Sequence, residues 1–145
     1  TIAVEVQGGD GDDTLLGTDA DADWTLSGPD RGSVAGLVSF TGMEALVGGA
    51  EADNFALPAG AVSLSIDGGG GSDALVAPDS ANTWLIDGAD AGTLNGNLFR
   101  AIENLIGGSA DDTFSIAAAG SVSGLVDGGA DNDAAVLPPV DRISY

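Results

Sequence analysis

The feature of this sequence that most restricts its fold is a 60-residue internal repeat. The tetrapeptide that starts at Val6 returns at Ile66 and again at Val126, each time as an apolar residue, a polar residue and two glycines. Trp24 likewise returns as Trp84. A period of this kind predicts one supersecondary unit that stacks on copies of itself.

A shorter period of about 20 residues runs inside each block. Its segments open with an apolar residue that is soon followed by glycine, at Val6, Leu26, Leu46, Ile66, Ile86, Leu105 and Val126. Apolar residues such as Val62 and Leu64 alternate with small or polar ones, which is the periodicity of strands, and glycine recurs too often for long helices. We predict an all-β fold, a parallel β-solenoid of about seven coils of roughly 20 residues. A triangular β-helix and a flattened two-sheet roll both fit this pattern.

The repeat also predicts the domain organisation. Residues 1–145 form a single repeat array, in which 1–5 end a preceding coil, 6–65 and 66–125 are two full blocks, and 126–145 begin a third. Both ends fall within strand-like segments, so we expect a fragment of a longer chain with open sheet edges that favour end-to-end self-association.

Stacking of the coils predicts ladders of inward apolar residues. One ladder is expected to contain Phe55, Leu75 and Phe114, and a second to contain Val4, Trp24, Leu64 and Trp84. In this arrangement the two tryptophans are core residues that lie three coils apart, about 14 Å along the axis at the spacing of β-strands.

Charge restricts the partners of the chain. It has a net charge of −20, three arginines, and no lysine, histidine or cysteine. Such a surface repels nucleic acid and anionic lipid, and the sequence contains no apolar run long enough for membrane insertion. It attracts divalent cations, although the acidic residues also fit a simpler role in solubility.

The turns that open the coils carry the most informative motif. Residues 8–16 read GGDGDDTLL and residues 68–76 read GGGGSDALV, and both fit the nonapeptide GGxGxDxUx, in which U is a large apolar residue. The chain here resembles the hemolysin-type (RTX) calcium-binding repeats and, over nearly its whole length, the β-strand repeats of large bacterial adhesins. The turns at Gly48, Gly107 and Gly128 keep both glycines and the aspartate but lose the fourth-position glycine.

This resemblance implies that calcium is bound by the sixth-position aspartates, which are Asp13, Asp53, Asp73, Asp112 and Asp133. Neighbouring coils would stack Asp53 on Asp73 and Asp112 on Asp133, where carboxylates repel unless a cation lies between them. The alternative is that each aspartate closes its own turn by accepting hydrogen bonds from backbone N–H groups.

The resemblance to adhesin repeats implies a function as well. We expect a structural spacer or stalk module, secreted or on a bacterial cell surface, whose partners are calcium ions and adjacent repeats of the same parent chain. A carbohydrate- or receptor-binding adhesin segment is the main alternative. A polysaccharide-processing β-helix enzyme is disfavoured, because Arg31 and Arg100 are not equivalent in the repeat and no histidine or lysine is present. An ice-binding solenoid is disfavoured because Asn54 interrupts the row that Thr14 and Thr113 share.

Overall fold

The computed structural model describes residues 4–35, 38–60 and 62–139, and within them it contains sixteen strands and no helix. The strands of the first half are β1 Val4–Gln7, β2 Thr14–Leu16, β3 Ala22–Gly28, β4 Arg31–Val34, β5 Val38–Thr41, β6 Ala45–Gly49, β7 Asp53–Ala56 and β8 Ser65–Gly69. Those of the second half are β9 Ala74–Val76, β10 Thr83–Gly88, β11 Ala91–Leu94, β12 Asn97–Arg100, β13 Asn104–Gly108, β14 Thr113–Ile116, β15 Val126–Gly129 and β16 Ala134–Val136. The part of the chain that the structure describes has no helix that is long and apolar enough to span a membrane.

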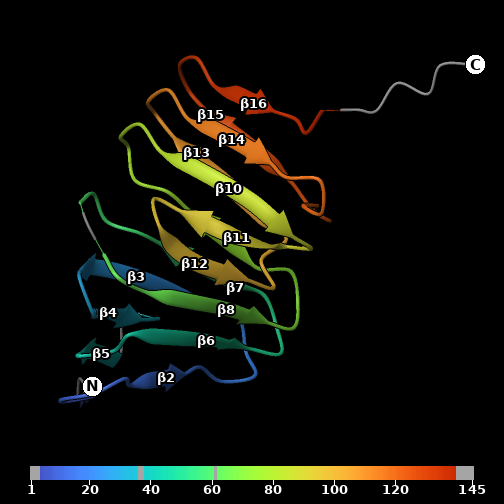
Figure 1. Cartoon of the computed structure of the whole chain (residues 1–145). Coiled ribbons are helices and arrows are strands. Elements are labelled where there is room, and N and C mark those ends of the chain that lie inside the picture. Colours follow the sequence, from blue (N-terminus) through green and yellow to red (C-terminus); the bar gives the residue numbers. More distant parts are fainter. Residues whose placement is uncertain (1–3, 36–37, 61, 140–145) are drawn as a thin grey trace, which may run out of the picture.

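The strands form two mixed sheets of eight strands each. The first sheet has the order β1-β5-β4-β3-β7-β9-β13-β15, and the second has the order β2-β6-β8-β12-β11-β10-β14-β16. In Figure 1 the second sheet rises from β2 near the N-terminal end to β16 near the C-terminal end. Outside the segments β3-β4-β5 and β10-β11-β12, the chain passes from one sheet to the other between consecutive strands, so that both sheets grow together.

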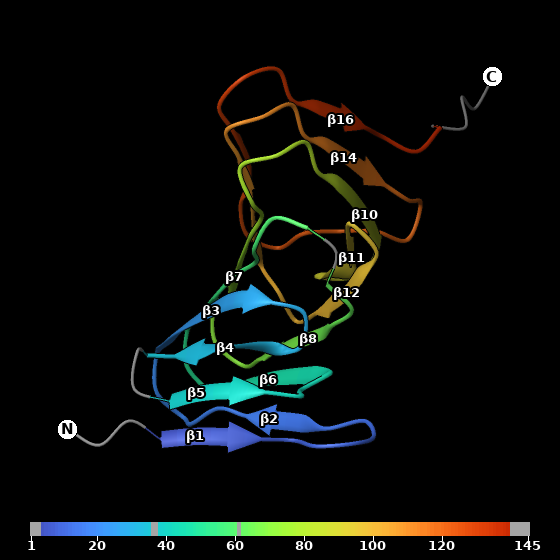
Figure 2. The same ribbon diagram turned by 90° about the vertical axis from the view of Figure 1, so that its left-hand side faces the viewer.

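The predicted parallel pairing is correct for the steps between coils but incomplete. β6 pairs with β8 and β7 with β9 in parallel, so that Ala45 lies beside Ser65 and Asn54 beside Ala74. The prediction of about seven coils of roughly 20 residues does not hold at β3-β4-β5 and β10-β11-β12, because these segments are antiparallel meanders within one sheet. Figure 2 shows the first meander above β1. Each meander lengthens its coil. In the first block the parallel partners β3 and β7 are therefore farther apart in sequence than β7 and β9, which have no meander between them.

The 60-residue repeat exchanges the two sheets. The first meander lies in the first sheet, and its repeat copy lies in the second. The other strands follow the same rule, since β6 and β7 recur as β13 and β14 on opposite sheets. One block is therefore related to the next by a half turn about the stacking axis as well as a rise along it.

This exchange corrects the predicted apolar ladders. Trp24 and Trp84 lie in opposite sheets rather than in one row. In the first sheet Phe55 pairs with Leu75, as predicted, but Phe114 pairs with Trp84 in the second sheet. The physical reason is that the chain crosses between the sheets an odd number of times in each block, which brings the next copy of each strand to the opposite sheet.

The core lies between the sheets and is built around the two tryptophans, as expected. Trp24 and Trp84 are both buried. Trp24 stacks on Phe55 and Trp84 on Phe114, each with ring centroids 5.3 Å apart. Phe40 and Phe99 each contact the tryptophan of their own block at a steeper angle. Each block thus carries its own aromatic cluster, in the sheet that holds its meander.

Candidate functional site: the glycine and aspartate turns

All five predicted aspartates lie where the chain enters a strand. Asp53 is the first residue of β7, and the others directly precede their strands, which are β2 for Asp13, β9 for Asp73, β14 for Asp112 and β16 for Asp133. Asp53, Asp73 and Asp112 are buried, Asp13 is half-buried, and Asp133 is exposed on the last strand of its sheet. Burial of so many carboxylates requires compensating hydrogen bonds.

The predicted stack of Asp53 and Asp73 is present, and Glu103 extends it. The backbone N–H of Asp53 donates to Oδ1 of Asp73 over 2.7 Å. The N–H of Asp73 donates in turn to Oε2 of Glu103 over 2.8 Å. Each carboxylate thus binds the backbone of the coil beneath it, and the three residues form what we call the first acid ladder.

A second acid ladder stands on the other side of the molecule and contains Asn82, Asp112 and Asp133. The N–H groups of Asn82 and Asp112 donate to Oδ1 of the residue above, over 2.8 and 2.9 Å. The predicted stack of Asp112 and Asp133 is therefore present. Asp13 begins a third ladder, since its N–H donates to Oε2 of Glu44 over 2.9 Å. In every ladder the side chain nearer the C-terminal end is the acceptor.

Four further side chains belong to the ladders and were not predicted from the sequence, namely Glu44, Asn82, Asn97 and Glu103. Asn97 accepts the N–H of Leu64 and so replaces a carboxylate by an amide. A signal for the two glutamates was available, because they occupy the same place in the copies FTGMEALVGG and FRAIENLIGG. The asparagines carried no comparable signal, because they adjoin the meanders, where the shorter period is lost.

The first glycine of each pair makes room for the aspartate. A Cβ atom added to Gly48 would overlap Oδ2 of Asp53 and the carbonyl oxygen of Gly68, and the same holds for Gly107 beside Asp112. The second glycine donates its N–H to that Oδ2, over 2.8 Å from Gly49 to Asp53 and over 2.9 Å from Gly108 to Asp112. These turns are closed by the aspartate itself, as the alternative to calcium requires.

The turns that open each block are closed differently. Gly69 and Gly129 have φ angles of +95° and +94°, and their N–H groups donate to Oδ1 of Asp67 and Asp127. Asp73 therefore receives no hydrogen bond from its own turn, and its buried Oδ2 has no partner among the described residues. The same is true of Oδ2 of Asp13, one block earlier. Positive φ is an inexpensive conformation only for glycine, which explains the retained second glycine.

The environment of Asp73 changes its acidity. Burial raises the pKa of Asp73 to about 6, the N–H of Asp53 opposes this rise, and the charges of Glu103, Asp53 and Asp67 add to it. No cation among the described residues offsets this group, because Arg100 pairs with Asp67 and Arg31 with Asp30. The ladder therefore contains a carboxyl group that takes up a proton near pH 6.

We expect Asp73→Asn to remove one component of the pH dependence of stability. The folded chain holds the Asp73 proton more tightly than the unfolded chain, so the free energy of unfolding falls as pH rises from about 4 to about 6. The change from this group is roughly 2 to 3 kcal/mol. Urea unfolding of wild type and variant across this pH range measures it. Asp12→Asn, at an exposed residue, is the control, and equal pH profiles for Asp73→Asn and wild type would contradict the assignment.

The aspartates do not assemble an oxygen cage. Among residues 4–35, 38–60 and 62–139, no group of three or more acidic side chains is placed to hold a metal ion. Calcium takes six to eight oxygen ligands, whereas these carboxylates face backbone N–H groups. Calcium binding by the five aspartates stays a prediction, and the hydrogen bonds at Asp53 and Asp112 favour a role of these two in closing their turns.

No protein-family model, curated protein or solved structure matches this chain. The likeness to adhesin repeats and to RTX repeats is therefore a likeness of motifs. The acid ladders and the surfaces of the sheets are therefore the features that indicate what the described residues can do chemically.

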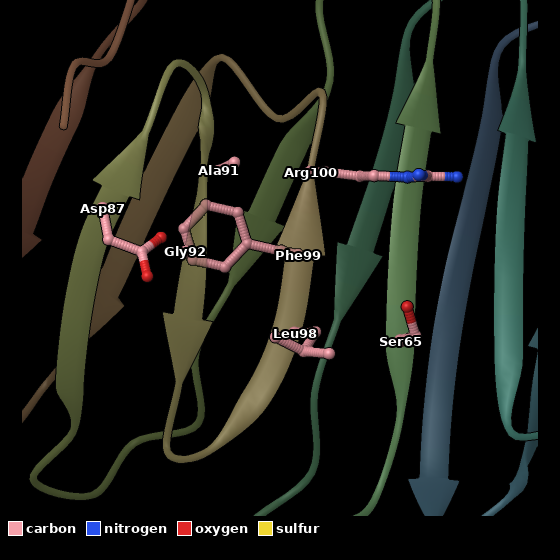
Figure 3. A pocket seen from close by; sticks show the side chains of 7 residues that line it. All are labelled: Ser65, Asp87, Ala91, Gly92, Leu98, Phe99 and Arg100. Carbon is pink, nitrogen blue, oxygen red and sulfur yellow. The ribbon is translucent and has the colours of Figure 1, made fainter. Parts of the chain in front are cut away.

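A groove of about 410 Å³ on the second sheet is a local departure from the repeat. Its lining includes Ser65, Asp87, Leu98 and Arg100. Figure 3 shows Arg100 extending from β12 across β8, where its guanidinium binds Asp67 over 2.6 Å. The first block has serine and threonine at the places of Leu98 and Arg100. Because Arg100 is already paired, the groove offers a small apolar surface with the acid Asp87 at its edge.

Proposed function

We propose that this chain is a segment of a β-solenoid spacer in a large secreted or cell-surface protein, with no catalytic role. The observation that carries the proposal is the continuity of the two sheets across both blocks, which a half turn and a rise relate to each other. A unit of this kind adds length without limit, because each coil offers the next the same strand edges. The acid ladders and aromatic clusters recur with the blocks and serve this stacking.

The spacer proposal predicts a length that is proportional to the number of repeats. Over two blocks, from β1 to β15, the first sheet advances from its first strand to its eighth. At about 4.8 Å per strand, each added pair of blocks lengthens the rod by about 34 Å. Small-angle X-ray scattering of this chain, extended at its C-terminal end by one or two further copies of residues 26–145, measures this, because residue 145 corresponds to residue 25 and these copies continue the repeat in phase. A constant cross-section with linear growth supports the proposal, and a compact particle whose width grows overturns it.

Calcium dependence is tested by thermal unfolding. We expect the same melting temperature, within about a degree, in excess calcium and in chelator, because a ligand stabilises only a state that binds it. A rise of several degrees that calcium causes and magnesium does not, and that Asp112→Asn abolishes, would confirm the calcium prediction. It would also make the spacer one that becomes rigid when calcium is bound.

A receptor-binding segment is the second candidate, and the groove on the second sheet favours it. The double substitution Leu98→Ser and Arg100→Thr gives this block the residues of the first block, Ser39 and Thr41. If the groove binds a glycan or host surface, beads coated with this variant should adhere to that glycan or surface less than beads coated with the wild-type chain. Equal adhesion of both proteins favours the spacer.

A further inference from the structure

The two ends of the stack carry most of the exposed large apolar residues of the described chain. β1 and β2 end the sheets on one side, and β15 and β16 end them on the other. Six of the eight exposed large apolar residues lie on or beside these strands: Val4, Leu16, Leu125, Val126, Val136 and Leu137. Each terminal strand has one hydrogen-bonded neighbour within the described chain, so its outer edge is a template for another strand.

The terminal strands of each sheet run in the same direction. In the first sheet β1 pairs in parallel with β5, and the two antiparallel steps through β4 restore that direction at β3. The remaining pairs up to β15 are parallel. The second sheet also has two antiparallel steps among parallel ones, so β2 and β16 run in the same direction. A second copy in the same orientation therefore offers parallel partners to both sheets at once.

The shapes of the two ends are complementary. A hollow of about 240 Å³ lies between β15 and β16 and is lined in part by Phe114, Val126 and Ala135. Ala135 faces this hollow at a place where earlier copies of the repeat carry Leu15 and Leu75. At the opposite end Leu15 is only partly buried against the core. A leucine seated over Ala135 fills a space that the small side chain leaves open.

The hydrogen bonds of the ladders are complementary as well. In each ladder, a backbone N–H group of one coil donates a hydrogen bond to a side-chain oxygen of the coil nearer the C-terminal end. Asp13 starts its ladder beside β2, which ends the second sheet on one side, and Asp133 ends another ladder beside β16, which ends the same sheet on the other side. Placing Asp13 of one copy above Asp133 of another continues the pattern, with the Asp133 N–H donating to the Asp13 carboxylate.

We infer that a second copy of this chain docks on the C-terminal end through β1 and β2, with residue 13 above residue 133. Directly stacked turns in this chain keep their glycine pairs in register, as Gly49 does with Gly69, and the same register sets Gly9 of the second copy above Gly129. Val6 then lies above Val126, and residue 15 lies above residue 135. The inference deepens the proposed spacer by naming its partner, since the edges that join repeats also join separate chains.

Sedimentation velocity of the whole 145-residue chain, from micromolar to millimolar concentration, tests the docking. We expect linear oligomers that grow with concentration and are favoured by salt, because each copy carries a net charge of −20. Ala135→Lys places a charge in the hollow and should weaken association by about tenfold or more. Ser115→Lys adds the same charge on the outer face of the neighbouring strand β14, outside the lining of the hollow, and should not weaken it. Monomers under all conditions, or equal weakening by both variants, overturn the inference.

The register has its own test, because the chain has no cysteine. Thr14→Cys combined with Ala134→Cys places two thiols on adjacent strands of different copies. At the spacing of about 4.8 Å between paired strands they are within the range for a disulfide. Leu16→Cys with Ala134→Cys is displaced by two residues, about 6.6 Å along the strand, and serves as the control. We expect a series of disulfide-linked multimers from the first cysteine pair alone. Equal yields of multimers from the two pairs, or a higher yield from the control pair, overturn the register.

The outcomes also separate this inference from the proposed function. A chain that stays monomeric but lengthens linearly when blocks are added in tandem is a spacer without docking ends. A chain that associates but does not lengthen in proportion to its repeats has docking ends and is not a spacer.

Discussion

Gly68→Ala is expected to lower the free energy of unfolding by about 3 kcal/mol or more. A Cβ atom at this position would overlap the carbonyl oxygen of Ala101 and Oδ2 of Asp73. The first obstacle is the backbone of the next coil, and the second belongs to a buried ladder residue whose Oδ1 accepts the N–H of Asp53, so the added methyl group has no free space. Urea unfolding at constant pH measures the loss.

Gly70→Ala is the matched control for this prediction. It lies in the same turn, but its added Cβ would lie 3.6 Å from its nearest neighbour, the carbonyl oxygen of Ala50, which is ordinary contact. We expect little change in stability. Equal effects of the two substitutions would mean that the loss of glycine flexibility, and not close packing around the ladder, explains the result at Gly68.

Trp84→Ala is expected to cost about 3 to 5 kcal/mol, as other large-to-small substitutions of buried aromatic residues do. Trp84 is fully buried, stacks on Phe114 and contacts the edge of Phe99. Its removal leaves a cavity between the sheets that a rigid stack of strands closes poorly. The same unfolding measurement applies, and an unchanged midpoint would contradict the described core.

The equivalent tryptophans provide a sharper comparison. Nε1 of Trp84 has no hydrogen-bond partner among the described residues, whereas Nε1 of Trp24 lies 3.4 Å from Oδ1 of Asp53. Trp84→Phe should therefore be tolerated better than Trp24→Phe, which removes a donor from a buried carboxylate. The reverse order would show that ring volume outweighs the hydrogen bond.

The stacked aspartates could be predicted from the sequence because their spacing follows the shorter period. Asp53 and Asp73 lie one such period apart, as do the strands that carry them. Their partners could not be predicted in the same way, because a motif with glycines and aspartates fits both a metal ligand and a turn closed by its own side chain. Only the positions of the N–H groups of Gly49 and Gly108 in the structure favour a turn that is closed by its own aspartate.

The meanders were missed because alternation of apolar and polar residues is the same in parallel and antiparallel strands. One local signal was present. Asn95 and Gly96 form the two-residue loop between β11 and β12, with φ angles of +50° and +87°. An Asn-Gly pair between apolar segments is typical of a hairpin. The first block has Ala35, with the same φ angle, in place of Asn95. The Asn-Gly signal is therefore absent from the first block, and comparison of the two blocks did not reveal the hairpin.

The exchange of sheets between blocks has a consequence for how such a chain can change in length. A given surface position of one block faces the opposite direction in the next block and returns to its original side only after a second block. Gain or loss of a single block would turn everything beyond it by half a rotation relative to everything before it. Gain or loss of two blocks would preserve the direction in which each side faces, so length changes that keep the outer surface aligned come in pairs.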